Sequence, residues 1–219
     1  MDARPVTAAE FDTLEGLGDW RFILGALHAE FAAPGFSQGA ALVAGIAAAA
    51  DAADHHPEVS LRYPGRVRVV LSTHDAGGPT ELDVTMARTV SALAAQHGAP
   101  PAPRVAQGVE VAIDTMDADR IRPFWAAVLG YRVDGGNLVD PARMGPTFWF
   151  QQMSAPRPGR DRFHIDVTVA HELAEERVAA ALAAGGTLVT DRFARAWWVL
   201  ADADGNEACI CTWQDRTQG

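Results

Sequence analysis

The sequence is poor in cysteine and contains no lysine. Its two cysteines, Cys209 and Cys211, are separated by one residue on a predicted strand, where they would share one face with poor disulfide geometry. We therefore expect a reducing, cytoplasmic setting. All 18 basic residues are arginine, and 28 acidic residues outnumber them, which gives a net charge of -10. This balance argues against a nucleic-acid partner, because phosphate contacts need clustered Arg or Lys.

Long apolar runs are missing as well. The most apolar stretch, residues 39–53, is too short and too rich in alanine to span a bilayer. Residues 1–16 show neither a basic leader nor an apolar signal segment. We therefore expect no membrane partner and no export. The hydrophobic content of 48% is sufficient for packed cores, and 219 residues suit one large domain or two small ones.

A proline-rich segment divides the chain. Residues 99–104, APPAPR, disfavour both helix and strand, and they separate an alanine-rich helical pattern from a new alternating strand pattern. We place a first domain at residues 1–99, a linker at 100–106 and a second domain at 107–219. The first domain reads as strands, helix, strands and helix, with Thr80 as the N-cap of the last helix, which predicts a small α+β layer.

The second domain contains an internal duplication. Residues 108–133 and 162–189 each read as strand, acidic turn, helix, glycine and strand. Each is followed by further short strands, at residues 146–153 and 196–213. The pattern predicts a tandem βαβββ fold. We expect the two sheets to curl around one shared cleft, on which matching strand positions converge.

Three of the seven histidines lie around one predicted strand pair in the first domain. His55 and His56 end the alanine-rich helix immediately before Pro57, and His74 follows the strand at 66–73. Histidine can give and take protons near neutral pH, so a convergent set suits acid–base chemistry. A metal site is less favoured, because neighbouring residues on a helix diverge by about 100°. The remaining alternative is a set of ordinary histidines at the ends of a helix and a strand.

The first domain resembles the pterin-4a-carbinolamine dehydratases along nearly its whole length. The residues that carry the resemblance are Trp20, Arg21, Phe31, Phe36, DxxxHHPE at 51–58, Tyr63, LSTHD at 71–75 and TxxD ending at Asp83. The resemblance implies an αββαββα fold. It also implies a pterin pocket lined by Asp51, His55, His56, His74 and Asp83, with Ser72 and Thr73 beside the pterin ring.

The implied reaction is the dehydration of a 4a-hydroxytetrahydropterin to the quinonoid dihydropterin, catalysed by a hydro-lyase that requires no cofactor. One proton goes to the departing hydroxyl and another is taken from a ring nitrogen. We expect His55 and His74 to transfer these protons and His56 and Asp83 to position the ring. Asp51, one turn before His55 on the same helix face, would hold an imidazole tautomer. The resemblance and an exposed edge strand also favour a homo-oligomer.

The second domain resembles the glyoxalase-like branch of the vicinal-oxygen-chelate superfamily, which includes bleomycin-resistance proteins, over residues 108–213. The resemblance rests on AIDTMDADRIRPFWAAVLGY, FWFQQM, RFHIDVTV and VLADADGNEACIC. Metal-dependent members take ligands from the first and last strands of each module. Those places hold Glu110, Gln151, His164 and Cys209, with Glu207 as a substitute for the missing terminal carboxylate. This set could coordinate a divalent metal. The alternatives are a glyoxalase-like domain that keeps the fold without such chemistry and a His164 that lines the pocket or the core.

Two alternatives to the dehydratase function follow from the second domain. It could be a resistance-type binding protein that sequesters a small aromatic compound, with Trp197 or Phe148 facing the cleft and stacking on the ligand. It could also be a metal-dependent enzyme that acts through His164. Chelators would inactivate the metal-dependent enzyme and leave the dehydratase unaffected.

Overall fold

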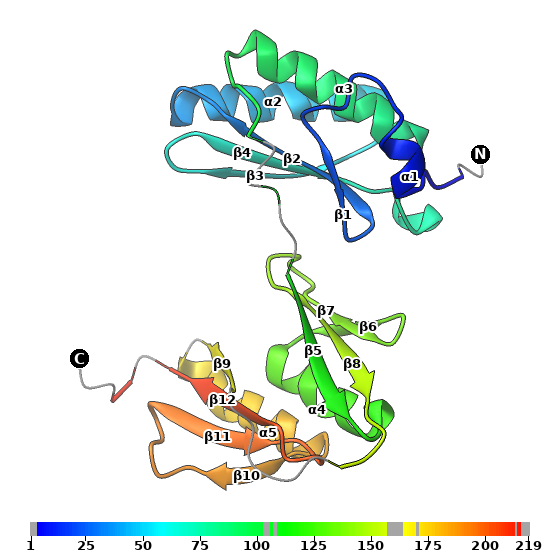
Figure 1. Cartoon of the computed structure of the whole chain (residues 1–219). Helices are drawn as coiled ribbons and strands as arrows, with labels where there is room; N and C mark the ends of the chain where they lie inside the picture. Colours follow the sequence, from blue (N-terminus) through cyan, green and yellow to red (C-terminus); the bar gives the residue numbers. More distant parts are fainter. Residues whose placement is uncertain are drawn as a thin grey trace. The chain divides into compact units, whose positions relative to one another are not determined.

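The computed structural model describes residues 4–102, 106, 109–156, 164–169, 171–212 and 214–215, with only the backbone described at His74. The chain divides into two compact units, Met1–Gly108 and Val109–Gly219 (Figure 1). Both units combine helices with β-sheets, which confirms the α+β class predicted from the sequence.

The first unit has the predicted element order αββαββα. Its elements are α1 (Ala8–Phe11), β1 (Arg21–Ile23), β2 (Ala26–Ala32), α2 (Phe36–Ala53), β3 (Glu58–Arg62), β4 (Arg66–Leu71), the short 3-10 helix η1 (His74–Ala76) and α3 (Glu81–Gln96). The strands form one antiparallel sheet in the order β1-β2-β4-β3. Helices α2 and α3 cover one face of this sheet (Figure 1).

Buried side chains alternate with more exposed ones along the central strands of the first unit, and the buried ones form its core. Leu27 and Phe31 of β2 and Val67 of β4 are fully buried, and they belong to one cluster with Leu42 and Ile46 of α2. Each such side chain contributes about 1.5–3 kcal/mol when it leaves water. Of the described helices, only α2 is long and apolar enough to cross a membrane by length and composition, and its Leu42 and Ile46 side chains lie in this core.

Residues 100–102 of the proline-rich segment extend the first sheet. The backbone N–H of Ala32 donates to the carbonyl of Pro100 at 2.9 Å, and the N–H of Ala102 donates to the carbonyl of Glu30 at 2.7 Å. These bonds lie beside β2 where the short β1 no longer reaches. Proline has no N–H to donate, so it fits a strand only where its carbonyl does the pairing. Residues 103–105 of the expected linker lie outside the described residues.

The turn between β3 and β4 requires a glycine. A Cβ atom at Gly65 would lie 2.7 Å from the carbonyl oxygens of both Ala33 and Gly35. The same close approach lets the N–H of Ala33 donate to the carbonyl of Gly65 at 2.9 Å. This contact fixes the β3–β4 hairpin against the start of α2.

The second unit confirms the tandem βαβββ duplication. The first module contains β5 (Glu110–Thr115), α4 (Ala118–Leu129), β6 (Arg132–Asp134), β7 (Asn137–Val139) and β8 (Thr147–Gln152). The second contains β9 (Ile165–Thr168), η2 (His171–Leu173), α5 (Ala174–Ala183), β10 (Thr187–Thr190), β11 (Trp197–Ala201) and β12 (Glu207–Cys211). The sheets repeat the same order, β5-β8-β7-β6 and β9-β12-β11-β10, and the first and last strands of each module pair in parallel.

The two modules meet through their helices. Helix α4 packs on β7 and β8, α5 packs on β11 and β12, and the helices contact each other. Trp125 of α4 and Ala181 of α5 share one buried cluster with Ile210 of β12. Because successive side chains of a strand point to opposite faces, Cys209 and Cys211 of β12 lie on the face away from this cluster, in a separate group.

Candidate functional site

His55 in the first unit is held by a buried carboxylate. Helix α2 ends at Ala53, and the left-handed conformation of its C-cap Asp54 (φ 48°) turns the chain away from the helix axis. The Nε2 atom of His55 lies 2.8 Å from Oδ1 of Asp83, and the two side chains are 12% and 0% exposed. A carboxylate can only accept a hydrogen bond, so Nε2 carries a proton, and in the neutral form of the ring Nδ1 is the nitrogen with the lone pair.

Asp83 is placed by the start of α3. Thr80 is the N-cap, as predicted, and Asp83 is the third helical residue, so the two form a capping box. The Oδ2 atom of Asp83 accepts hydrogen bonds from the backbone N–H of Thr80 at 2.7 Å and from Oγ1 of Thr73 at 2.7 Å. A buried charge needs such donors, and this one has them on both oxygens.

Asp51 pairs with His56 instead of with His55. The Nε2 atom of His56 lies 3.0 Å from Oδ1 of Asp51, and both side chains are more than half exposed. The expectation that Asp51 holds a tautomer therefore applies to His56. A polar contact this exposed contributes little to stability.

The remaining predicted residues follow β4. Ser72 and Thr73 are half-buried, and Thr73 forms a β-bridge with Gly78. His74 opens η1, and its side chain lies outside the described parts of the chain. The structure thus brings His55, Thr73 and Asp83 into one hydrogen-bond network. The neighbouring His56 forms a separate pair with Asp51. The sequence reading gave Thr80 only a capping role, although the TxxD spacing already placed it against Asp83.

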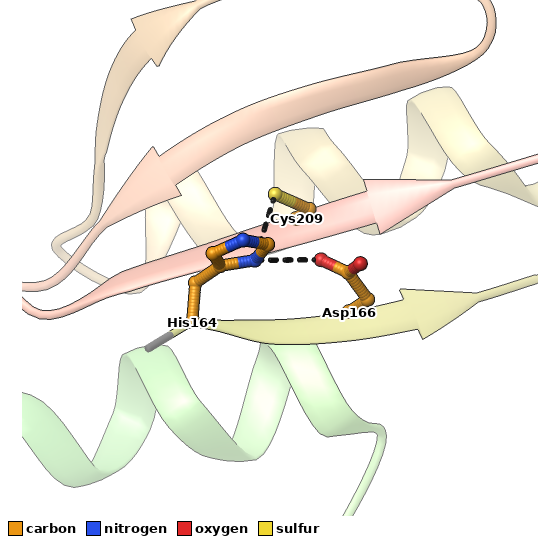
Figure 2. Close-up of side chains that lie close together, drawn as sticks. All are labelled: His164, Asp166 and Cys209. Atoms are coloured by element: carbon orange, nitrogen blue, oxygen red, sulfur yellow. Dashed lines mark hydrogen bonds and ion pairs between the residues drawn. The ribbon is translucent and has the colours of Figure 1, made fainter. Parts of the chain in front are cut away.

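In the second unit, three side chains that can bind metal converge. His164 immediately precedes β9, Asp166 lies on β9, and Cys209 of β12 is in direct register with Asp166. The Nδ1 atom of His164 lies 2.8 Å from Oδ1 of Asp166 and 3.7 Å from Sγ of Cys209 (Figure 2). All three ligand atoms lie within 4.8 Å of one another.

These three residues line an open cavity of about 1070 Å³ on the face of β9 and β12 away from the helices. Glu207 and Cys211 of β12 also line it. Burial, followed by the hydrogen bond to Asp166, raises the pKa of Cys209 to about 12, so the thiol stays protonated at neutral pH. A metal ion would have to displace that proton. Thiolate, imidazole and carboxylate are donor types that zinc takes in proteins, so the three residues fit that ion.

Glu110 and Gln151 lie elsewhere. In the parallel pairing of β5 with β8, Gln151 is opposite Asp114, whereas Glu110 is opposite Thr147, four residues away and roughly 13 Å along the strand. Gln151 and Asp114 line a separate, smaller cavity of about 380 Å³. The expected single cleft is thus divided into distinct cavities.

Asp166 was missed by the sequence reading, and its signal was the spacing His-x-Asp, which places two side chains on one face of a strand. Of the two aromatic residues expected to face the cleft, Trp197 lines the larger cavity and stacks on Phe193 with ring centroids 4.5 Å apart. The expectation for Phe148 was wrong. It is 3% exposed and stacks on Trp125 in the core.

Comparisons with known proteins agree with this division of the chain. Residues 4–93 match the family model for pterin 4 alpha carbinolamine dehydratase, and residues 110–211 match the model for a glyoxalase-like domain. A candidate pterin-4-alpha-carbinolamine dehydratase of Rhizorhabdus wittichii is 41% identical over 97 residues, which cover 43% of this chain and 99% of the relative.

Two solved structures are also similar to the chain. The crystal structure of a transcriptional coactivator/pterin dehydratase from Brucella melitensis is 35% identical, with a TM-score of 0.39, and the match covers 42% of this chain and 99% of that one. A glyoxalase/bleomycin resistance protein/dioxygenase family enzyme from Burkholderia phytofirmans is 22% identical, with a TM-score of 0.39, and the match covers 47% of this chain and 95% of that one. The family models and the Rhizorhabdus relative show that the chain belongs, through its first unit, to the pterin-4a-carbinolamine dehydratase family, and that it carries a glyoxalase-like domain in its second.

Proposed function

We propose that the first unit dehydrates a 4a-hydroxytetrahydropterin to the quinonoid dihydropterin. The observation that supports this most strongly is the hydrogen bond from Nε2 of His55 to the buried Asp83. It leaves Nδ1 of a neutral imidazole as a proton acceptor, which is what a general base at a ring nitrogen requires.

In the proposed reaction, His55 takes the proton from the ring nitrogen through Nδ1. The electron pair of that N–H bond forms the new C=N bond, and the bond from C4a to the hydroxyl oxygen breaks. His74 delivers a proton to the departing hydroxyl, which leaves as water. General acid–base catalysis of this kind contributes about 10²- to 10⁴-fold. His56, with its partner Asp51, and the half-buried Ser72 and Thr73 would contact the pterin ring.

Stopped-flow dehydration of a freshly generated 4a-hydroxytetrahydropterin tests this function. We expect the wild-type chain to accelerate the reaction, and we expect His55→Gln and His74→Gln each to lose most of the acceleration. His97→Gln is the matched control, because His97 caps the far end of α3. A folded wild-type chain that gives no rate above buffer would rule the proposal out.

We also infer that the first unit assembles into a homo-oligomer. In its described sheet β3 is an edge strand, paired only with β4, and such an edge is stabilised by pairing with another chain. Light scattering coupled to size-exclusion chromatography measures the assembly. A monomeric mass at micromolar concentration would contradict it.

A second candidate function concerns the cavity of the second unit. We infer that His164, Asp166 and Cys209 bind a divalent metal ion such as zinc, and the convergence of their ligand atoms supports this. Bound zinc would act as a Lewis acid beside the cavity. Trp197 and Phe193 line the same cavity and offer a stacking surface for a small aromatic ligand. The second unit could therefore also be a binding domain for such a compound.

Calorimetric titration with zinc tests whether the cluster is a metal site. We expect zinc to bind the wild-type chain in a 1:1 ratio and to bind Cys209→Ser and His164→Ala at least tenfold more weakly. His171→Gln should bind like the wild type, because His171 does not line the cavity. Equal binding by all four chains would show that the cluster is not a metal site. Dehydratase activity should persist in EDTA.

A further inference from the structure

Two threonines lie behind the Asp83 carboxylate, on the side away from His55. Thr80 is fully buried and Thr73 is half-buried. Their Oγ1 atoms are 2.9 Å apart, and Oγ1 of Thr73 lies 2.7 Å from Oδ2 of Asp83. Oγ1 of Thr80 also lies 3.3 Å from the same oxygen, a longer contact. The backbone N–H of Leu82 donates to Oγ1 of Thr80 at 3.3 Å.

The direction of this hydroxyl chain follows from the number of hydrogens. Each threonine hydroxyl has one, and a carboxylate only accepts. The short contact with Asp83 uses the hydrogen of Thr73, so the bond between the two hydroxyls must use the hydrogen of Thr80. The two shorter bonds therefore run from Thr80 to Thr73 to Oδ2 of Asp83, and each polarises the next, while the 3.3 Å contact of Thr80 with Oδ2 is the weaker branch.

This arrangement divides the two carboxylate oxygens between two tasks. Oδ2 is occupied by Thr73 and by the backbone N–H of Thr80, while Oδ1 faces His55. The carboxylate cannot rotate to another orientation without breaking at least two of these bonds inside the protein, where each lost bond leaves a group unsatisfied.

The capping box at the other helix start provides a contrast. At α1, the Oγ1 of Thr7 donates directly to Oε2 of Glu10 at 2.9 Å, and the contact is exposed. Thr7 and Thr80 thus have the same position in the same motif, but only Thr80 is buried and linked through a second hydroxyl to a carboxylate that holds a histidine.

We propose that Thr80 is a positioning residue for His55. Acting through Thr73, it fixes the orientation of Asp83, which in turn holds His55 in the tautomer with the proton on Nε2 and the lone pair on Nδ1. The importance of this role for catalysis rests on the proposed dehydratase function, whereas the tautomer itself can be measured without any substrate.

The experiment uses the full chain with ¹⁵N-labelled histidine. Long-range ¹H–¹⁵N correlation spectra identify the tautomer, and comparison with His55→Gln assigns the His55 signals. We expect one tautomer in the wild type at pH 7.5, a mixture in Thr80→Val, and the single tautomer again in Thr80→Ser. Thr73→Val breaks the chain while leaving the N-cap in place, and it should give the same mixture if Thr80→Val folds poorly. Thr7→Val, which removes a cap from α1, should leave the His55 signals unchanged.

Stopped-flow rates on the same variants give the second readout. We expect kcat of Thr80→Val to fall roughly threefold to tenfold, the effect of one hydrogen bond, with KM changing by less than about twofold. Thr80→Val could instead keep the single tautomer and the wild-type kcat and show only a lower melting temperature. Thr80 would then be a helix cap with no positioning role, and the inference would be wrong. A mixture of tautomers in the wild type would overturn the inference even if the enzyme turns over. If the wild type gives no turnover but the tautomers respond as expected, the dehydratase proposal fails and the positioning role stands.

Discussion

Asp83 and His55, 28 positions apart in the sequence, meet through a 2.8 Å hydrogen bond between Oδ1 and Nε2. The bond joins the first turn of α3 to the segment that follows α2. It therefore serves both the packing of the two helices and the orientation of the imidazole.

The substitution Asp83→Asn tests this double role. An amide offers one acceptor oxygen where the carboxylate offers two, so either His55 or the Thr73 and Thr80 donors lose their partner. We expect the free energy of unfolding to fall by about 1–3 kcal/mol, and dehydratase kcat to fall at least tenfold. Urea denaturation and stopped-flow kinetics measure the two effects. Asp51→Asn, in the exposed pair with His56, should change stability by less than about 0.5 kcal/mol. Equal stability of both variants would contradict the argument.

The first unit should lose stability in mild acid because of His28. Burial, and then the positive charge of Arg68, lower the pKa of His28 below its ordinary value of 6.5, against the weaker opposing effects of the Ile23 carbonyl and Glu58. Below pH 6.5 the unfolded chain therefore binds more protons than the folded chain, and the free energy of unfolding falls as the pH falls.

We expect His28→Gln to show a smaller loss of unfolding free energy between pH 7.5 and pH 5.5 than the wild type, measured by urea denaturation at each pH. Arg68→Gln removes one of the two lowering causes and should give an intermediate loss. The same loss in all three chains would show that other groups govern acid stability.

Zinc binding to the second unit should depend steeply on pH. The pKa of Cys209 is raised to about 12, so its thiol is protonated throughout the range from pH 6.5 to pH 8, and each bound zinc ion must release that proton. Affinity should therefore rise by about tenfold per pH unit. Calorimetry in two buffers of different ionisation enthalpy counts the proton released. Binding without any proton release would mean that Cys209 is not a ligand.

The substitution Gly65→Ala should destabilise the β3–β4 hairpin. Its Cβ would meet two backbone carbonyl oxygens at 2.7 Å, and backbone atoms cannot move aside as a flexible side chain can. We expect a loss of about 1–3 kcal/mol in urea denaturation. At Gly18 an added Cβ meets nothing within 4 Å, so Gly18→Ala should be neutral or slightly stabilising. A loss of the same size at both positions would refute the steric explanation.

Local patterns in the sequence were sufficient to predict the helices and strands of this protein. They were not sufficient to predict every hydrogen-bond partner of the site residues. The periodicity of the alanine-rich stretch predicts α2, and helical spacing then places Asp51 under His55. That spacing fails because the helix ends at Ala53 and Asp54 adopts a left-handed conformation, which brings His56 to Asp51 and frees His55 to reach Asp83.

The second unit shows the same limit at the level of whole modules. The duplication and its strand order were predicted from repeating patterns, yet nothing in either repeat specifies which faces of the two sheets meet. In the structure the modules meet through α4 and α5. Asp166 lies beside His164 and Cys209 because β9 pairs in parallel with β12, with Asp166 directly opposite Cys209. Contacts made between distant segments depend on how side chains pack, which no single stretch of sequence records.

The pairing of residues 100–102 with β2 also bears on aggregation. An uncovered strand edge is a template for intermolecular pairing, and beyond β1 the Glu30–Ala32 edge of β2 is covered by Pro100 and Ala102. A chain cut at residue 99 would keep every predicted pterin-site residue while exposing that edge. Such a truncated chain would self-associate through β2, so a first unit prepared alone should extend at least to Ala102.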